Sequence, residues 1–195
     1  MPALIHKDNK PIYYFKNQKE FEKWLGKNFN KVDAVWLRFY KKNSGVKSVN
    51  YAEALDVALC YGWIDGLVNK YDNDSYLQRF TPRRPRSLWS RKNIENTERL
   101  IATGKMKAPG LKEIEKAKED GRWAAAYDSS ANMEIPEDLK KFLDKSKKIK
   151  TFFESLNKTN KFAIVWSLQT AKKPETRKRR FKIIMEMLKK GEKFH

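Results

Sequence analysis

The sequence contains one cysteine, Cys60, and only two histidines, His6 and His195. A single cysteine excludes an internal disulfide and any metal cluster built on several cysteines. With so few histidines, neither a Ser-His-Asp triad nor a histidine metal site is expected. We therefore expect no metal and no cofactor, and we interpret Cys60 as a small buried helix residue in a reducing compartment.

Long hydrophobic runs are also lacking. The first segment, MPALIHKDNKP, loses its apolar character after five residues, and this predicts neither a signal peptide nor a membrane span. A cytoplasmic location is the expectation that remains. The 195 residues are nevertheless 40% hydrophobic, with 6 Trp, 8 Tyr and 11 Phe. This is enough apolar material for the core of one compact domain, or of a domain with a helical appendage.

Acidic residues are scarce relative to basic ones. The formal net charge is +19, and residues 139–195 hold 18 Lys and Arg against 5 Asp and Glu. Such a charge attracts anions, but it does not choose among nucleic acid, phosphorylated metabolites and anionic lipid. A lysine-rich solvated surface explains the same excess without any ligand.

The first 85 or so residues mix helix and strand patterns. Asn17 and Asn50 each precede a glutamate by three residues, the spacing of a capping box, and predict helices over 18–28 and from 51 to about 62. The alternation in VWLRFY, 35–40, predicts a strand, and residues 12–15 are a further candidate. LVNKY and SYLQRFT flank a turn at 72–74 and predict a hairpin. We therefore expect an α+β fold, with a small antiparallel sheet covered by helices.

From residue 90 onward the apolar residues recur at helical spacing. Ser90, Pro109 and Pro136 are expected to open helices, and three further apolar stripes run through 149–156, 162–166 and 181–188. The polar segment DSSANME predicts a linker. The expected organisation is an α+β domain over residues 1–127, a linker over 128–134 and a mainly helical, basic region over 135–195.

The block from residue 61 to 93 concentrates arginine and aromatic residues. We expect the turn after Gly62 to present Trp63 and Asp65 to the hairpin, and Arg79 and Thr81 to share one side of the sheet. Arginine binds carboxylates and phosphates and stacks on aromatic rings, and a helix N-terminus after residue 90 also favours anions. We therefore expect a cleft for an anionic ligand, formed by Tyr61, Trp63, Asp65, Arg79, Thr81, Arg83, Trp89, Ser90 and Asn93.

A structural interpretation of the same block is equally open. In that interpretation Asp65 forms an ion pair with Arg79 under the hairpin, and the tryptophans fill the core. Ion pairs of this kind are common, and arginine-rich sites mark function only probabilistically.

The ordered combination of YGWIDG, RFTPRR, WS, DGRWAAAY at 120–127 and AKKPETRKRR at 171–180 resembles the bacterial YdeI/OmpD-associated family of bacteriocin-protection proteins. The resemblance runs from about Trp36 to Lys190. The nine site residues above match its central block, and its C-terminal block is matched by Arg122, Trp123, Glu175, Thr176 and Arg177. The resemblance implies a role in tolerance of bacteriocins or cationic peptides, and the family name suggests an envelope partner. It implies no settled catalytic residues.

Three functions remain open at this point. The first is a non-enzymatic protein that binds an anionic small molecule in the expected cleft. The second is an enzyme in which Asp65 acts as a base while Arg79 and Arg83 fix an anionic substrate. The third is nucleic-acid binding through the basic C-terminal helices.

A secondary basic site is expected on the last helix, whose outside carries Arg177, Arg179, Arg180 and Lys182. These side chains form either a solvated face or a surface that contacts phosphates. Anionic lipid is a further possible partner. No recognised nucleic-acid motif is present in the sequence.

Overall fold

A computed structural model of the chain describes residues 5–128 and 132–194. The chain divides into two compact units. The N-terminal unit holds the residues up to Trp89 together with Asn93–Ala125, and the C-terminal unit holds Ser90–Lys92 and the chain from Ala126. Residues 129–131 of the expected linker and His195 lie outside the described residues, as do residues 1–4.

The N-terminal unit is built on one five-stranded sheet with the strand order β1-β2-β3-β5-β4. The strands are β1 (Ile5–Lys7), β2 (Lys10–Tyr13), β3 (Val35–Tyr40), β4 (Trp63–Lys70) and β5 (Ser75–Pro82). The accompanying helices are α1 (Gln18–Asn28), α2 (Tyr51–Cys60), α3 (Arg91–Ala102) and α4 (Ala108–Glu119), with a short 3-10 turn at Lys42–Ser44. The α+β fold class predicted from the sequence is confirmed.

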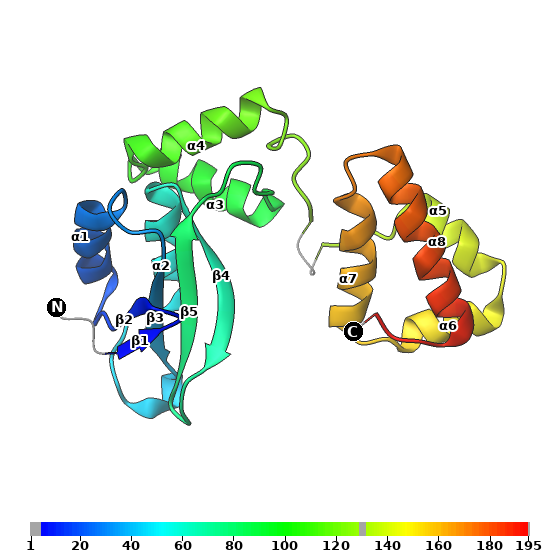
Figure 1. Ribbon diagram of the computed structural model, residues 1–195, viewed down its shortest axis with the longest axis horizontal. Helices are drawn as coiled ribbons and strands as arrows, with labels where there is room; N and C mark the ends of the chain where they lie inside the picture. Colours follow the sequence, from blue (N-terminus) through cyan, green and yellow to red (C-terminus); the bar gives the residue numbers. More distant parts are fainter. Residues whose placement is uncertain (1–4, 129–131, 195) are drawn as a thin grey trace. The chain divides into compact units, whose positions relative to one another are not determined.

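The sheet is mixed, which differs from the antiparallel sheet expected. β2 and β3 pair in parallel, whereas the β1–β2, β3–β5 and β4–β5 pairs are antiparallel. The cause is the connection between β2 and β3, which is helix α1 (Figure 1). Neighbouring parallel strands need such a crossover connection, which is usually a helix.

The helix starts and the hairpin follow local hydrogen bonds that the sequence encodes. Asn50 and Glu53 form a complete capping box at the start of α2. At α1 the Asn17 side chain accepts from the N–H of Glu20, while the Glu20 carboxylate accepts from the N–H of Lys16. In the β4–β5 turn, the Asp72 carboxylate accepts from the N–H of residue 74 and from the Ser75 hydroxyl, as expected of an aspartate turn.

The two faces of the sheet carry different clusters. One face packs under α1 and α2, and its buried residues include Val35, Leu37, Phe39 and Phe80. The opposite face carries a smaller cluster of Ile12, Trp36 and Leu77, with Tyr71 packed against it. Side chains that alternate along a strand thus belong to different layers.

Helix α4 packs very closely on the end of α2. A Cβ atom added to Gly110 would lie 2.5 Å from the Cys60 carbonyl oxygen and 2.7 Å from that of Leu59. Gly62, in the turn that follows α2, has a φ of 71°, and its own added Cβ would lie 3.0 Å from the Pro109 carbonyl oxygen. The turn in YGWIDG is therefore covered by α4 instead of lying open.

The C-terminal unit consists of helices packed around one apolar core. Its helices are α5 (Glu137–Asp144), α6 (Lys147–Ser155), α7 (Lys158–Gln169) and α8 (Pro174–Lys190). The core contains Leu139, Phe153, Ile164 and Leu188. Among the described residues, none of the helices is long and apolar enough to span a membrane.

Candidate ligand-binding site

The aromatic residues expected in the cleft lie inside the N-terminal unit. Trp63 is the first residue of β4 and is 0% exposed, and its indole N–H donates to the Phe29 carbonyl at 3.1 Å. Tyr61 packs against the Phe29 ring, and burial raises the pKa of its phenol. Trp63 is therefore a core residue, as expected in the structural interpretation.

Asp65 and Arg79 lie on opposite faces of the sheet. Asp65 pairs across the strands with Phe80, whose side chain belongs to the helix-covered core, and its carboxylate accepts from the Tyr51 hydroxyl at 2.9 Å. Arg79 instead pairs with Trp36, which belongs to the opposite cluster. Directly paired residues share a face. Asp65 and Arg79 therefore do not form the ion pair of the structural interpretation. Arg79 is also not placed beside Asp65 to hold a substrate for an Asp65 base.

On its own face, Arg79 lies beside Trp36 of β3. Its Nε and the Nε1 of Trp36 are buried and have no hydrogen-bond acceptor among the described residues. The Lys7 ammonium lies 5.3 Å from the centroid of the Trp36 ring. Thr81, two residues further along β5, is half-buried. Because Trp36 is 0% exposed, a ligand in solvent cannot reach its indole in this conformation.

Arg83 and Trp89 form a second cluster, in which the Arg83 backbone N–H donates to the Gly62 carbonyl at 2.9 Å. The Arg83 guanidinium carbon lies 3.6 Å from the Trp89 ring centroid, and Nη1 donates to the Leu88 carbonyl at 3.2 Å. The Trp123 ring contacts the Trp89 ring at a tilt, with 4.9 Å between the ring centroids, and Arg122 donates to the Ser87 carbonyl at 3.0 Å. Arg83 is 6% exposed and Trp89 is 2% exposed. The cluster brings together residues from two separate blocks of the family resemblance, 61–93 and 120–127. Their side chains pack against one another in the interior of the unit.

Ser90 and Asn93 belong to different units. Helix α3 begins at Arg91, directly after Ser90, as predicted. Ser90 forms an isolated bridge with Tyr127 inside the C-terminal unit, whereas Asn93 is grouped with the N-terminal unit. The ligand-binding role predicted for the nine residues stays a prediction, and the structure does not gather them around one hollow.

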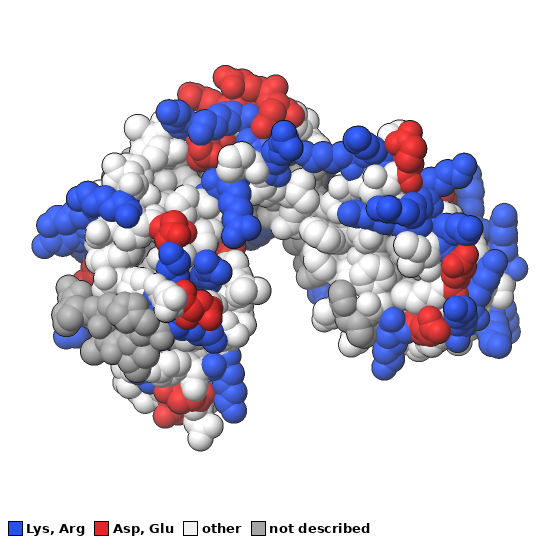
Figure 2. All heavy atoms as spheres, viewed as in Figure 1, with Lys and Arg blue, Asp and Glu red and all other residues white. Residues whose placement is uncertain are grey.

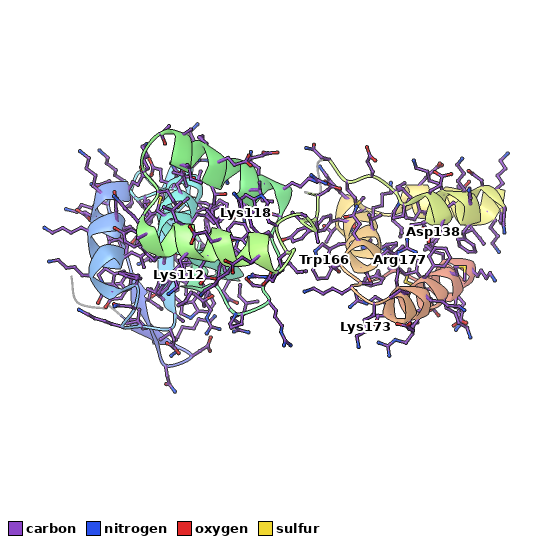
Figure 3. The ribbon with its side chains drawn as sticks, turned by 90° about the horizontal axis from the view of Figure 1, so that it is seen from above. Lys112, Lys118, Asp138, Trp166, Lys173 and Arg177 are labelled. Atoms are coloured by element: carbon purple, nitrogen blue, oxygen red, sulfur yellow. The ribbon has the colours of Figure 1, made fainter. Side chains whose placement is uncertain are left out.

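The secondary basic set on α8 splits in two. Arg177 makes a bidentate ion pair with Asp138, with oxygen distances of 2.6 and 2.9 Å (Figure 3), and Arg180 donates to the Ser167 carbonyl at 2.7 Å. Arg179 and Lys182 are exposed. The hydrogen bonds from Arg177 lower the pKa of the Asp138 carboxyl group.

A hollow that the sequence did not predict lies elsewhere in the N-terminal unit. Its volume is about 290 Å³. It is lined by Gln18, Lys19 and Glu22 of α1, by Asp56, Val57 and Cys60 of α2, and by Leu100, Gly104, Lys105 and Lys107 at the end of α3 and in the loop before α4. We call it the lysine-rimmed cavity.

The floor of the lysine-rimmed cavity is apolar and its rim is charged. Val57, Cys60 and Leu100 are each at most 6% exposed. Both rim carboxylates have cationic partners, since Asp56 accepts from Arg99 at 2.6 Å and Glu22 lies 3.5 Å from the Lys107 ammonium. Lys19 and Lys105 are exposed and make no ion pair with any residue in the described part of the chain. The rim therefore has two cations without carboxylate partners.

The thiol in the floor is neutral. The pKa of Cys60 is raised to about 11, mainly by burial and also by the nearby carboxylates of Glu22 and Asp56, against the opposing effect of Lys107 and Lys105. The thiol is thus protonated at neutral pH and is a small apolar surface, not a nucleophile. No group of three or more His, Cys, Asp or Glu suited to a metal ion occurs within residues 5–128 and 132–194.

Sequence reasoning missed this cavity because its walls come from three separate segments. The only local signal is the spacing of charged and apolar residues on α1 and α2, such as Asp56 and Cys60 four positions apart. That spacing places two residues on one helix face, but it does not reveal that the loop at 104–107 lies opposite.

Comparison with family models gives two matches. Residues 13–113, more than half of the chain, match the family described as a domain of unknown function (DUF8412). Residues 132–191 match the family described as bacteriocin-protection, YdeI or OmpD-associated. The second match spans α5–α8 and is narrower than the resemblance over 36–190, since the block at 61–93 falls under the first match.

Comparisons with curated proteins and with solved structures gave no match. The two family matches cover separate parts of the chain, residues 13–113 and residues 132–191. The chain belongs to the family defined by this domain of unknown function (DUF8412), and its residues 132–191 carry the resemblance to the bacteriocin-protection, YdeI or OmpD-associated family.

Proposed function

We propose that the protein is a non-enzymatic binding protein for a small anionic molecule, which it holds in the lysine-rimmed cavity. The observation that carries this proposal is the pairing of an apolar floor with two rim lysines, Lys19 and Lys105, that have no carboxylate partner among the described residues. The proposal keeps the anionic ligand expected from the sequence and moves its site from the arginine block to this cavity.

The chemistry of the walls indicates the class of ligand. A volume of about 290 Å³ lies at the lower end of the range for ligand pockets, so the ligand is small. Val57, Cys60 and Leu100 would contact an apolar body, while the ammonium groups of Lys19 and Lys105 would hold its anionic head as point charges. A short aliphatic or aromatic carboxylate or phosphate monoester has this chemistry.

The positions of the reactive side chains support binding over catalysis. Asp65 bonds to Tyr51 and is separated from Arg79 by the sheet, so the substrate anchor required by the Asp65 base hypothesis is not beside it. The Cys60 thiol is protonated because its pKa is about 11. Neither group is arranged as an activated nucleophile with an adjacent base.

The family description adds a biological frame to the proposal. The family of residues 132–191 is named for bacteriocin protection. Direct capture of a cationic peptide by a protein of net charge +19 is electrostatically disfavoured. If the chain shares this protective role, the role would therefore act through the bound anion and so through metabolism. The free, buried Cys60 supports our proposal of a cytoplasmic location.

Isothermal titration with hexanoate, benzoate and phenyl phosphate tests the proposal. We expect at least one of these probes to bind, and the double variant Lys19→Gln, Lys105→Gln to weaken its binding at least about tenfold, since charge-assisted hydrogen bonds are removed. Lys42→Gln, Lys112→Gln is the matched control, because both lysines are exposed and neither lines the cavity. No binding of any probe, or equal weakening in both double variants, would overturn the proposal.

A further inference from the structure

One face of α8 carries a row of cations along the C-terminal unit. The row consists of Lys178, Arg179, Lys182, Lys189 and Lys190, which are all exposed. With 3.6 residues per turn, the five positions fall within an arc of about 120° around the helix axis. Glu175 and Glu186 fall in the same arc, so cations outnumber carboxylates there. We call this row the basic ridge.

The basic ridge differs from the other arginines of the same helix. Arg177 and Arg180 are half-buried, and their donors are used by Asp138 and the Ser167 carbonyl. None of the five ridge residues makes an ion pair with a residue in the described ranges. Their charges are therefore available to a partner, whereas those of Arg177 and Arg180 hold the unit together.

The ridge is presented on a rigid support. The face of α8 opposite the ridge carries Ile184 and Leu188, each 1% exposed, in the core of the unit. At a rise of 1.5 Å per residue, the ridge is about 18 Å long. Lys172 and Lys173, both exposed, directly precede the helix. Figure 2 shows Lys and Arg side chains spread over this unit, with fewer acidic side chains among them.

The apolar residues of α8 argue against insertion into a membrane. A helix that lies in a membrane interface needs a broad apolar face next to its cationic residues. In α8 that face is already packed in the core, and Ile183, 55% exposed, is the one large hydrophobic residue of the helix that is exposed within the described residues. A hydrated polyanion fits the ridge better than a bilayer does.

We propose that the C-terminal unit binds nucleic acid through the basic ridge, which contacts the phosphate backbone without reading the base sequence. Lysine-rich contacts to phosphates supply affinity that falls steeply with salt, and they need no groove-reading motif. This activity is separate from the anion binding proposed for the N-terminal unit, because the two use different residues.

Fluorescence anisotropy with the full chain and a short labelled duplex DNA tests the proposal across about 50 to 200 mM salt. The ridge variant changes all five residues to glutamine. The control variant changes Lys23, Lys27, Lys31, Lys42 and Lys112 to glutamine, and these are also exposed. Both variants lose the same net charge, so a difference between them reports the position of the cations and not their number.

We expect the duplex to bind with a strong salt dependence. The ridge variant should lose at least about tenfold in affinity at low salt, and its salt slope should fall by up to about 4.5, at about 0.9 for each phosphate that the variant no longer neutralises. The control variant should change affinity less than about threefold. Circular dichroism confirms that both variants fold.

Three outcomes would overturn the proposal. The first is equal weakening in the two variants, which would mean attraction by total charge alone. The second is binding that does not respond to salt. The third is ridge-dependent binding to phosphatidylserine vesicles that is tighter than binding to the duplex, which would assign the ridge to a membrane surface.

Discussion

The arginine–aromatic clusters of the N-terminal unit and the basic ridge of the C-terminal unit use their cations in opposite ways. In the N-terminal unit, arginines are covered by aromatic rings: Arg38 lies 4.5 Å from the Tyr40 ring and 4.6 Å from the Tyr71 ring, and Arg83 lies 3.6 Å from that of Trp89. In the C-terminal unit, a row of cations on α8 stays exposed. The comparison teaches that an arginine next to aromatic residues in the sequence is as readily a packing element as a ligand contact.

The largest effect is expected from breaking the arginine cluster of the N-terminal unit. Arg83→Ala removes a buried side chain that stacks on Trp89 and donates to the Leu88 carbonyl. We expect the free energy of unfolding to fall by about 3 kcal/mol, because the acceptors and the ring lose their partner. The measurement is denaturation in urea.

Arg84→Ala is the control for this variant, because Arg84 is the exposed neighbour. Its free energy of unfolding should stay within about 0.5 kcal/mol of the parent value. Equal effects of the two substitutions would contradict the structural role of Arg83.

The second test uses the single cysteine, which reports on the N-terminal unit alone. A pKa of about 11 against the usual 9.0 lowers the thiolate fraction of Cys60 about 100-fold near pH 8. We expect labelling by a thiol reagent to be slower than that of a small free thiol by at least this factor, and to accelerate as the pH rises toward 11. Labelling in denaturant is the control, and rapid labelling of the folded protein would contradict the buried thiol.

A smaller effect is expected at the ion pair of the C-terminal unit. Asp138→Asn removes the partner of Arg177, but the two side chains are 40% and 37% exposed, so solvent screening limits the loss of stability to about 1 kcal/mol. The pKa of Asp138 is lowered in the folded state. The contribution of the Asp138 carboxylate to the free energy of unfolding is therefore fully present above the pKa of the unfolded state, about 3.9. It is lost as the pH falls through the pKa of the folded state.

The measurement is denaturation at several pH values. The difference between the parent and Asp138→Asn should be full near neutral pH and should shrink as the pH falls through the lowered pKa of folded Asp138. A difference that grows as the pH falls would contradict the sign of the pKa shift.

The smallest effect on stability is expected on the ridge itself. Arg179→Gln and Lys182→Gln should each leave the free energy of unfolding within about 0.5 kcal/mol of the parent, because both side chains are exposed and without an ion pair in the described residues. Arg177→Gln is the comparison on the same helix, and it should behave like Asp138→Asn. If Arg179→Gln were as destabilising as Arg177→Gln, this would contradict the distinction between α8 arginines that make contacts within the unit and exposed α8 cations that can contact a partner.

Much of the fold was predictable because its signals are local. The asparagine caps at 17 and 50 and the aspartate turn at 72 act within a few residues, so the ends of α1, α2 and the hairpin follow from short segments of sequence. The parallel pairing of β2 with β3 was not predicted, because strand partners are chosen by the packing of α1 between them and not by the strand residues.

The predicted site was less reliable because it depends on which face each residue occupies. The register of β4 changes between Asp65 and Val68, and a bulge of this kind shifts the alternation of side chains without leaving a clear mark in sequence. The close packing of α4 on the turn after α2 likewise depends on residues about fifty positions away.

The start of α3 has a consequence for any attempt to dissect the chain. Arg91 donates its backbone N–H to the Tyr127 carbonyl at 2.9 Å, and its guanidinium lies 2.8 Å from the Asp128 carboxylate. A fragment that stops at Ala125 would therefore sever the first turn of α3 from both anchors, and its leading residues would fray. Limited proteolysis that cuts after Ala125 should for this reason expose new cleavage points near Trp89.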